Sequence, residues 1–184
     1  MVKRARASKP DRRVARTRRQ LRDALVSLVI ERGWDEVTLT DVCERADLGR
    51  STLYIHFADK ENLLLSRFRE LEASLESVQR GAPGTFAFAR ELLAHTQGNL
   101  QLFRALVATN AGRYVVLNLR DISVRLVAAD LKARRTTPPH PQLLARYIAG
   151  GLVELIVMWL EKPTRQSADE LADAFLALTR KVLG

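Results

Sequence analysis

The chain has 184 residues, of which 47% are hydrophobic and 28% are charged, and its formal net charge is +9. Its length and apolar content exclude a largely disordered chain, and its single cysteine, Cys43, excludes an intramolecular disulfide, which suits the reducing cytoplasm where we expect the protein to work. No uninterrupted apolar run reaches the roughly 20 residues that span a bilayer, and no apolar segment follows the basic N-terminus, so we expect neither a membrane protein nor a secretory signal.

The excess positive charge is concentrated at one end of the chain. The first 22 residues hold ten lysine or arginine side chains and one acid, whereas the other 162 residues carry twenty of each sign. We interpret residues 1–16 as a flexible basic arm. Such an arm attracts a polyanion, either nucleic acid or an anionic membrane surface. The alternative is a disordered, solubilising tail with no partner.

Four helices are predicted after the arm, because apolar residues recur at spacings of three and four and no hairpin signal is present. Gly33 is expected to end the first helix. Thr38 is a natural N-cap for the second, with Asp41 three residues later, and Asp47 is the expected turn residue after it. The predicted bounds are 17–32, 38–46, 50–57 and 60–80.

The rest of the chain is predicted to be helical as well. A Gly-Ala-Pro-Gly break at 81–84 and a proline-rich loop at 135–141 interrupt it. The sequence therefore predicts an all-α protein of about nine helices, with a three-helix helix-turn-helix DNA-binding domain over 17–60 and an effector-binding and dimerisation domain over 61–184. The remaining predicted helices are 85–96, 100–109, 113–134, 142–161 and 167–182.

The third predicted helix carries the pattern that points most directly to function. At about 100° per residue, Leu53 and Phe57 face the core. No acid occurs between Gly49 and Ala58. This favours a helix in a DNA major groove, where an arginine pairs with guanine, hydroxyls reach base edges and an isoleucine meets a thymine methyl. The alternative is an ordinary surface helix. The side chains away from the core are Arg50, Ser51, Thr52, Tyr54, Ile55 and His56.

Residues 39–64, LTDVCERADLGRSTLYIHFADKENLL, closely resemble the signature of the TetR family of bacterial transcriptional regulators. The resemblance covers Thr17 to about Leu71. It implies base contacts by Arg50, Ser51 and Thr52, and phosphate contacts by other residues of the motif. With Ile55, the expected DNA-binding residues are Thr38, Thr40, Arg50, Ser51, Thr52, Tyr54, Ile55, His56 and Lys60. The chain departs from the family pattern at Asp47, which replaces a turn glycine, and at Gly49, which replaces a capping serine.

The resemblance also implies a homodimer that binds a double-stranded DNA operator as a repressor and releases it when a small-molecule effector binds. The helix expected over 142–161 is apolar on more than one side, which favours burial on more than one side. The alternative is an ordinary intrachain bundle. The expected dimer residues are Tyr147, Gly151, Leu155, Trp159, Leu171, Phe175 and Leu178.

The middle helices combine apolar side chains with a few polar ones, which is typical of a ligand pocket. The expected effector is therefore partly apolar. A plain hydrophobic core shows the same pattern, so this alternative stays open. The expected pocket residues are Phe68, Phe88, Leu92, His95, Phe103, Leu106, Asn110, Tyr114 and Asn118.

Other classes of function fit the sequence less well. The three histidines, His56, His95 and His140, show no metal-ligand spacing, and no phosphate loop or nucleophile motif is present. We expect no enzyme activity, no metal and no cofactor, and a core role for Cys43. A helical module that binds a membrane surface or a protein partner through the basic arm is one alternative. A DNA-binding regulator without a ligand is another.

Overall fold

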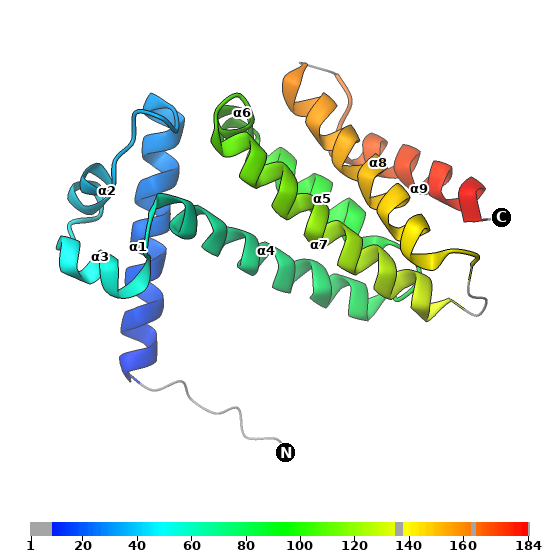
Figure 1. The fold of residues 1–184 in the computed structure, drawn as a ribbon, viewed down its shortest axis with the longest axis horizontal. Coiled ribbons are helices and arrows are strands. Elements are labelled where there is room, and N and C mark those ends of the chain that lie inside the picture. Colours follow the sequence, from blue (N-terminus) through cyan, green and yellow to red (C-terminus); the bar gives the residue numbers. More distant parts are fainter. Residues whose placement is uncertain (1–8, 135–137, 163–164, 184) are drawn as a thin grey trace. The chain divides into compact units, whose positions relative to one another are not determined.

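The computed structural model describes residues 9–134, 138–162 and 165–183, and every regular element in these ranges is an α-helix (Figure 1). The all-helical prediction is confirmed. The chain divides into two compact units, the first ending at Arg67 and the second beginning at Phe68. This division lies within α4, whereas we expected a boundary at residue 60. The helices are α1 (Lys9–Arg32), α2 (Leu39–Ala46), α3 (Arg50–His56), α4 (Lys60–Gly81), α5 (Ala87–Gly98), α6 (Leu100–Val107), α7 (Ala111–Ala133), α8 (Pro141–Glu161) and α9 (Ala168–Leu183).

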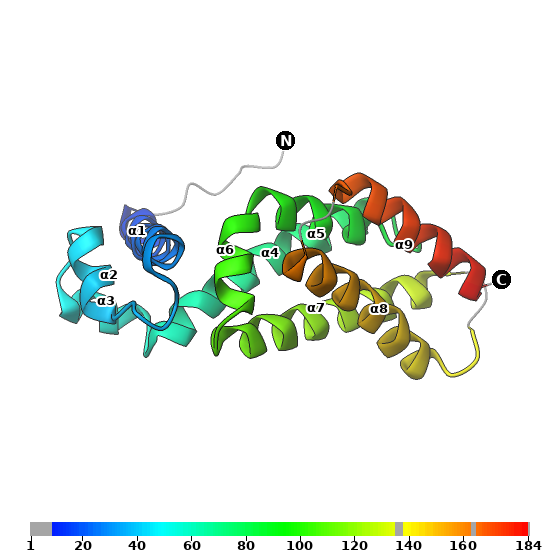
Figure 2. The ribbon, with the colours of Figure 1, turned by 90° about the horizontal axis from the view of Figure 1, so that it is seen from above.

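The first unit is built around α1. Both α2 and α3 lie on the same side of α1, as Figures 1 and 2 show. The apolar stripe of α1 is buried, and Leu21, Leu25 and Leu28 are each no more than 1% exposed. Leu53 of α3 is fully buried as well. Burying side chains of this size stabilises the unit by roughly 1.5–3 kcal/mol each relative to leaving them in water.

The helix α1 begins at Lys9, well before the predicted start at Thr17. From Arg12 to Arg32 the sequence has no glycine or proline, and arginine and alanine are good helix formers. The predicted basic arm is therefore divided. Residues 9–16 extend α1, and residues 1–8 lie outside the described residues.

The turns around α2 follow from local chemistry, as predicted. Thr38 Oγ1 accepts a hydrogen bond from the backbone N–H of Asp41 at 3.2 Å, and the Asp41 carboxylate accepts one from the Thr38 N–H at 2.8 Å. The two residues form a capping box. Asp47 follows α2 in the left-handed conformation, with φ 53° and ψ 48°. Aspartate tolerates this region better than most residues that carry a Cβ, so the turn forms without glycine.

The second unit contains α4 from Phe68 onward and α5 to α9. Figures 1 and 2 show α7 and α8 side by side, and α9 packs against α5 and, less extensively, against α8. Its core is formed by fully or almost fully buried apolar residues from each helix, and Phe88, Leu92, Leu106, Leu119, Leu152 and Ile156 are each no more than 1% exposed. Ser167 and Glu170 form the predicted capping box at the start of α9, since the Ser167 N–H donates to Glu170 Oε2 at 2.7 Å.

A buried carboxylate orders the loop that precedes α5. Asp130 of α7 is 1% exposed. Its two oxygens accept hydrogen bonds from the backbone N–H of Gly84 at 2.6 Å and of Phe86 at 3.0 Å. Phe86 is the N-cap residue of α5 and supplies no side-chain cap, so a carboxylate from α7 satisfies these donors instead. Burial raises the pKa of Asp130, and the bonds from Gly84, Gln79 and Phe86 oppose that shift.

The helix α8 is long and apolar enough to cross a membrane by length and composition, and 44% of its most apolar window is buried inside the protein. Arg146 and Glu154 interrupt its apolar residues, which is why no uninterrupted run of spanning length is found. A core helix of a soluble protein passes the same test, so this helix alone is weak support for a membrane span.

Candidate DNA-binding interface

The helix α3 is held by its inner face and by the turn before it. Leu53 and Phe57 are 0% and 4% exposed, so they anchor α3 in the core of the first unit. The backbone N–H of Leu48 donates to the Cys43 carbonyl at 3.0 Å, which closes the turn between α2 and α3. Gly49 caps α3 without a side-chain hydrogen bond. A Cβ at Gly49 would meet only Ser51 Oγ, at 3.8 Å, so the glycine is not required for steric reasons.

The outer face of α3 presents side chains to solvent, as its angular pattern predicts. Ile55 is 77% exposed and Tyr54 is 60% exposed, and Arg50 and Ser51 are exposed too. Within the described residues, the side chains of Arg50, Ser51 and Tyr54 make no hydrogen bond or ion pair. Their donors are therefore free for a ligand. An isoleucine this exposed has no role in the protomer's own packing, which suits an apolar contact to a base.

The two other predicted residues of α3 are half-buried. Thr52 lies at the edge of the outer face, and the His56 ring packs edge-on against the Phe57 ring, with centroids 6.4 Å apart. The guanidinium of Arg18, on α1, lies 5.9 Å from the centre of the same Phe57 ring. A cation from α1 thus lies near the C-terminal end of α3. The sequence analysis did not single out Arg18 within the basic segment.

A groove of about 360 Å³ lies between α2 and α3. Thr40, half-buried, lines it together with Arg50, and so do the acids Glu44 and Asp47. The predicted contacts Thr40 and Arg50 are therefore close to each other. The carboxylates of Glu44 and Asp47 would repel a phosphate inside this groove. We therefore expect phosphates to lie along the rim formed by the first turn of α2 and the exposed face of α3.

The structure assigns Thr38 mainly to helix capping. Its hydroxyl accepts from the Asp41 N–H and donates to Asp41 Oδ2. These bonds from Thr38 are the main reason that the pKa of Asp41 is below its ordinary value. Because the hydroxyl proton already has an acceptor, the side chain of Thr38 has no spare donor for a phosphate in this conformation.

Lys60 has a structural role that the sequence analysis missed. Its Nζ donates to the carbonyl oxygens of Trp34 and Val37, each at 2.7 Å, and lies 4.3 Å from the centre of the Trp34 ring. Partial burial lowers the pKa of Lys60, while Glu61 and Asp35 oppose the shift. An ammonium group has three N–H donors, so one donor is left for the phosphate contact expected of Lys60.

Arg45 joins α2 to α1 and was also missed. Its guanidinium forms two hydrogen bonds of 2.7 Å with the Glu31 carboxylate and one of 2.9 Å with Ser27 Oγ. The bond from Arg45 is the main cause of the lowered pKa of Glu31. Glu31 and Arg45 lie 14 residues apart, so no helical spacing reveals the pair.

Cys43 is 4% exposed, and burial raises the pKa of its thiol, in line with a core role.

The residues predicted to form the dimer interface separate into two groups. Trp159 and Leu171 are 3% and 2% exposed. They belong to the core of the second unit rather than to the surface that was predicted as the dimer interface. The other five line a groove of about 740 Å³ between α8 and α9, although Phe175 is only 4% exposed and so belongs to the core as well. The five are Tyr147, Gly151, Leu155, Phe175 and Leu178. The apolar residues of α8 and α9 are therefore divided between a buried inner face and an exposed outer face.

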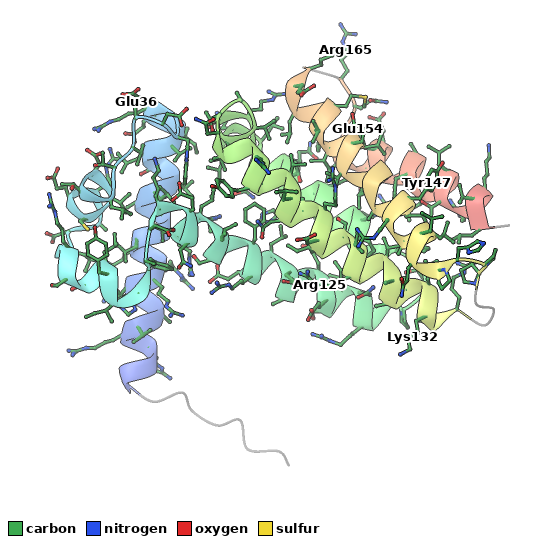
Figure 3. The ribbon with its side chains drawn as sticks, viewed as in Figure 1. Glu36, Arg125, Lys132, Tyr147, Glu154 and Arg165 are labelled. Carbon is green, nitrogen blue, oxygen red and sulfur yellow. The ribbon has the colours of Figure 1, made fainter. Side chains whose placement is uncertain are left out.

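The groove is open and rich in exposed apolar surface. Tyr147 is 67% exposed and Leu178 is 59% exposed, and Figure 3 shows Tyr147 and Glu154 on α8. Met158 and Val182, which the sequence analysis did not select, lie in the same groove and are 39% and 46% exposed. Clustered apolar side chains of this kind mark an interaction surface.

The predicted pocket residues also separate. The five apolar side chains lie in the core, each no more than 6% exposed: Phe68, Phe88, Leu92, Phe103 and Leu106. His95 is half-buried and packs edge-on against Phe103, with ring centroids 6.2 Å apart. Asn110 and Tyr114 are exposed, and Asn118 donates to the Tyr114 carbonyl at 2.9 Å. The apolar members therefore act first as core, which is the alternative left open by the sequence.

The chain is similar to known bacterial regulators in sequence and in fold. Residues 21–66 match the profile of the bacterial regulatory proteins of the tetR family. The chain is 28% identical over 178 residues to the HTH-type transcriptional repressor KstR of Rhodococcus jostii, covering 91% of this chain and 82% of KstR. It is 25% identical over 171 residues to the uncharacterized HTH-type transcriptional regulator YxbF of Bacillus subtilis, covering 90% of this chain and 45% of YxbF.

A solved structure shares the fold over nearly the whole chain. The TetR transcriptional regulator from Streptococcus agalactiae superposes with a TM-score of 0.68 at 23% identity, covering 92% of this chain and 97% of that one. The chain thus spans less than half the length of YxbF but almost all of this solved regulator.

Proposed function

This chain is a DNA-binding transcriptional regulator of the TetR family, and from that premise we propose that it is a cytoplasmic repressor that binds a two-fold symmetric operator as a homodimer. The relatives that match this chain over about nine-tenths of its length are regulators of transcription. We further propose that the protein represses transcription, that its operator has two-fold symmetry, and that binding of a small molecule releases it from DNA.

The outer face of α3 is the observation that carries the proposal. Arg50, Ser51 and Tyr54 are exposed and have no partner within the described residues, and the helix has no acid. Arginine and hydroxyl donors read base edges, and tyrosine donates to phosphates. We propose that Arg50, Ser51, Thr52 and Ile55 face the bases. Phosphate contacts are assigned to Tyr54, His56, Lys60 and, in the first turn of α2, Thr40, whereas Thr38 keeps its capping role.

The test is selection of binding sites from random duplex DNA in the presence of excess competitor DNA. We expect the enriched sites to have two-fold symmetry, with half-sites about one helical turn apart or slightly more. Binding that stays insensitive to sequence through every round would contradict the assignment of α3 as a reading helix. The recovered operator then allows a screen for small molecules that release it.

Two substitutions on α3 separate base reading from phosphate contact. Arg50→Ala is expected to weaken operator binding by about 1–3 kcal/mol and to relax preference at one base position. Tyr54→Phe removes a phosphate donor, so we expect weaker binding to all sequences alike. Binding titrations against the operator and against single-base variants measure both. Arg113→Ala and Tyr114→Phe, at exposed positions of α7, are the matched controls.

The N-terminal turns of α1 are expected to add phosphate contacts. Arg12, Arg13 and Arg16 are exposed there. Their combined replacement by glutamine is expected to lower the dependence of log affinity on log salt by about 0.9 for each arginine that contacts a phosphate. Titrations at several salt concentrations measure this slope. An unchanged slope would leave this part of α1 without a role in DNA binding.

The groove between α8 and α9 supports the homodimer. A two-fold axis brings the same groove of two copies together. Besides its apolar residues, the groove contains Arg146, Glu154 and Lys181. When two copies meet through this groove, Glu154 of one copy faces a surface that carries Arg146 and Lys181 of the other. We propose a four-helix interface built from α8 and α9 of each protomer.

We propose that an effector binds among α5, α6 and α7. Ser123 of α7 is fully buried, and its hydroxyl has no hydrogen-bond partner within the described residues. Such a group costs roughly 1–3 kcal/mol, and a polar ligand atom would remove that cost. With Ser123, the proposed site includes His95, Asn110 and Asn118. A differential affinity of a few kcal/mol between conformations is enough to release DNA.

A further inference from the structure

A second cavity in the second unit is separate from the groove between α8 and α9. It has a volume of about 480 Å³, which is within the usual size range of small-molecule sites. The loop before α5, the end of α7 and one face of α9 surround it. Its lining residues are Gly84, Thr85, Phe86, Arg90, Arg134, Asp173, Leu176 and Arg180.

The cations of this cavity exceed its acids. Arg90 is already neutralised, because it donates to the carboxylates of Asp169, at 2.6 Å, and of Asp173. Arg180 uses only its Nε, which donates to the Leu176 carbonyl at 3.2 Å. Arg134 makes no side-chain hydrogen bond within the described residues. The terminal N–H groups of Arg134 and Arg180 are therefore free to bind an anion.

One further acid, Asp130, lies close to the cavity and interacts electrostatically with Arg134 but forms no hydrogen bond with it. Asp130 is buried behind the loop, and both of its oxygens accept backbone N–H groups, from Gly84 and Phe86. It fixes the loop, and within the described part of the chain neither Arg134 nor Arg180 has a carboxylate in hydrogen-bond contact. An incoming carboxylate thus meets donors rather than a completed ion pair.

The same cavity has an apolar part. Phe86 is 3% exposed and Leu176 is half-buried, and both line it. We propose that this cavity binds a carboxylate that carries a short apolar chain, with the carboxylate between Arg134 and Arg180 and the chain against Phe86 and Leu176. A bare inorganic anion would use the arginines but leave the apolar surface uncovered, so it should bind more weakly.

The position of the site on α9 suggests a consequence for regulation, which rests on the proposed function. Leu176 and Arg180 face this cavity, whereas Leu178 and Val182 of the same helix line the groove assigned to the dimer. A ligand that joins Arg134 of α7 to Arg180 restrains α9 from one side. The helix presents its opposite side to the second copy.

Isothermal titration of the full-length protein with hexanoate tests the binding itself. We expect saturable binding of one hexanoate per protomer. Arg134→Gln and Arg180→Gln should each weaken it at least about tenfold, since each removes one of two charge-assisted contacts. Leu176→Asp should abolish it by placing a negative charge on the apolar part. Arg120→Gln, an exposed arginine of α7 outside the cavity, should bind as the unaltered protein does.

Three outcomes would overturn the site. The first is a binding heat that does not saturate as hexanoate is added, and the second is a hexanoate affinity that is unchanged in both arginine variants. The third is binding of inorganic phosphate as tight as that of hexanoate. Operator binding is measured separately on the same preparations. If the protein binds its operator but not hexanoate, only the proposed carboxylate site is wrong. If it binds no operator, the proposed function is wrong, and the hexanoate result still decides whether the cavity binds a carboxylate.

Discussion

Leu178→Glu is expected to convert the proposed homodimer into a monomer. Leu178 is 59% exposed and lies in the groove between α8 and α9. A two-fold interface would bury two glutamates, one from each copy, and leave them without enough partners. Sedimentation velocity at micromolar concentration should show the change from two protomers to one. Leu117→Glu is the matched control, because Leu117 is 41% exposed on α7 and lies outside the groove.

The same substitution should weaken operator binding by about 100-fold or more, because a dimer joins two half-site contacts and gains from their high effective concentration. Binding to an isolated half-site should change little, since α3 is untouched. A Leu178→Glu protein that remains dimeric would show that the apolar groove has another occupant, and the interface would have to be sought elsewhere on the molecule.

Asp130→Asn is expected to lower the free energy of unfolding by about 2 kcal/mol. Both carboxylate oxygens accept backbone N–H groups, at 2.6 Å from Gly84 and 3.0 Å from Phe86. An asparagine offers one oxygen, and its NH2 group faces the second donor. Denaturant unfolding at neutral pH measures the loss. Asp121→Asn, at an exposed position of the same helix, controls for the change of charge.

The effect of Asp130→Asn should also depend on pH. Burial raises the pKa of Asp130 in the folded protein above its ordinary value, so the folded state binds the proton more tightly than the unfolded chain. This contribution to stability is fully present below the ordinary pKa and is lost as pH rises through the raised pKa. The variant lacks it, so the destabilisation should be largest in acid and decline as pH rises. A difference that grows with pH would contradict the direction of the shift.

The helices and their ends were predictable because local interactions determine them. Thr38 and Asp41 lie three residues apart and cap α2 without help from the rest of the fold. The absence of acids on α3 and the spacing of Leu53 and Phe57 defined its inner and outer faces correctly. The start of α1 was wrong because its basic composition was interpreted as an arm, although arginine is a good helix former.

The contacts between distant residues could not be predicted in the same way. Lys60 reaches two carbonyls more than twenty residues earlier, and Asp130 orders a loop more than forty residues away. Hydrophobic periodicity reveals that a helix face is apolar but not what covers it. Trp159 and Tyr147 looked alike in the sequence, yet one is 3% and the other 67% exposed.

The sequence by itself therefore determined the all-helical fold, the caps and the exposed outer face of α3, because these depend on residues within a few positions of one another. Only the tertiary structure decided which apolar residues of α8 and α9 stay exposed, which polar groups are already bonded, and that Arg134 and Arg180 line one cavity. Packing of segments that are distant in the chain determines burial and hydrogen-bond partners, and no local pattern encodes that packing.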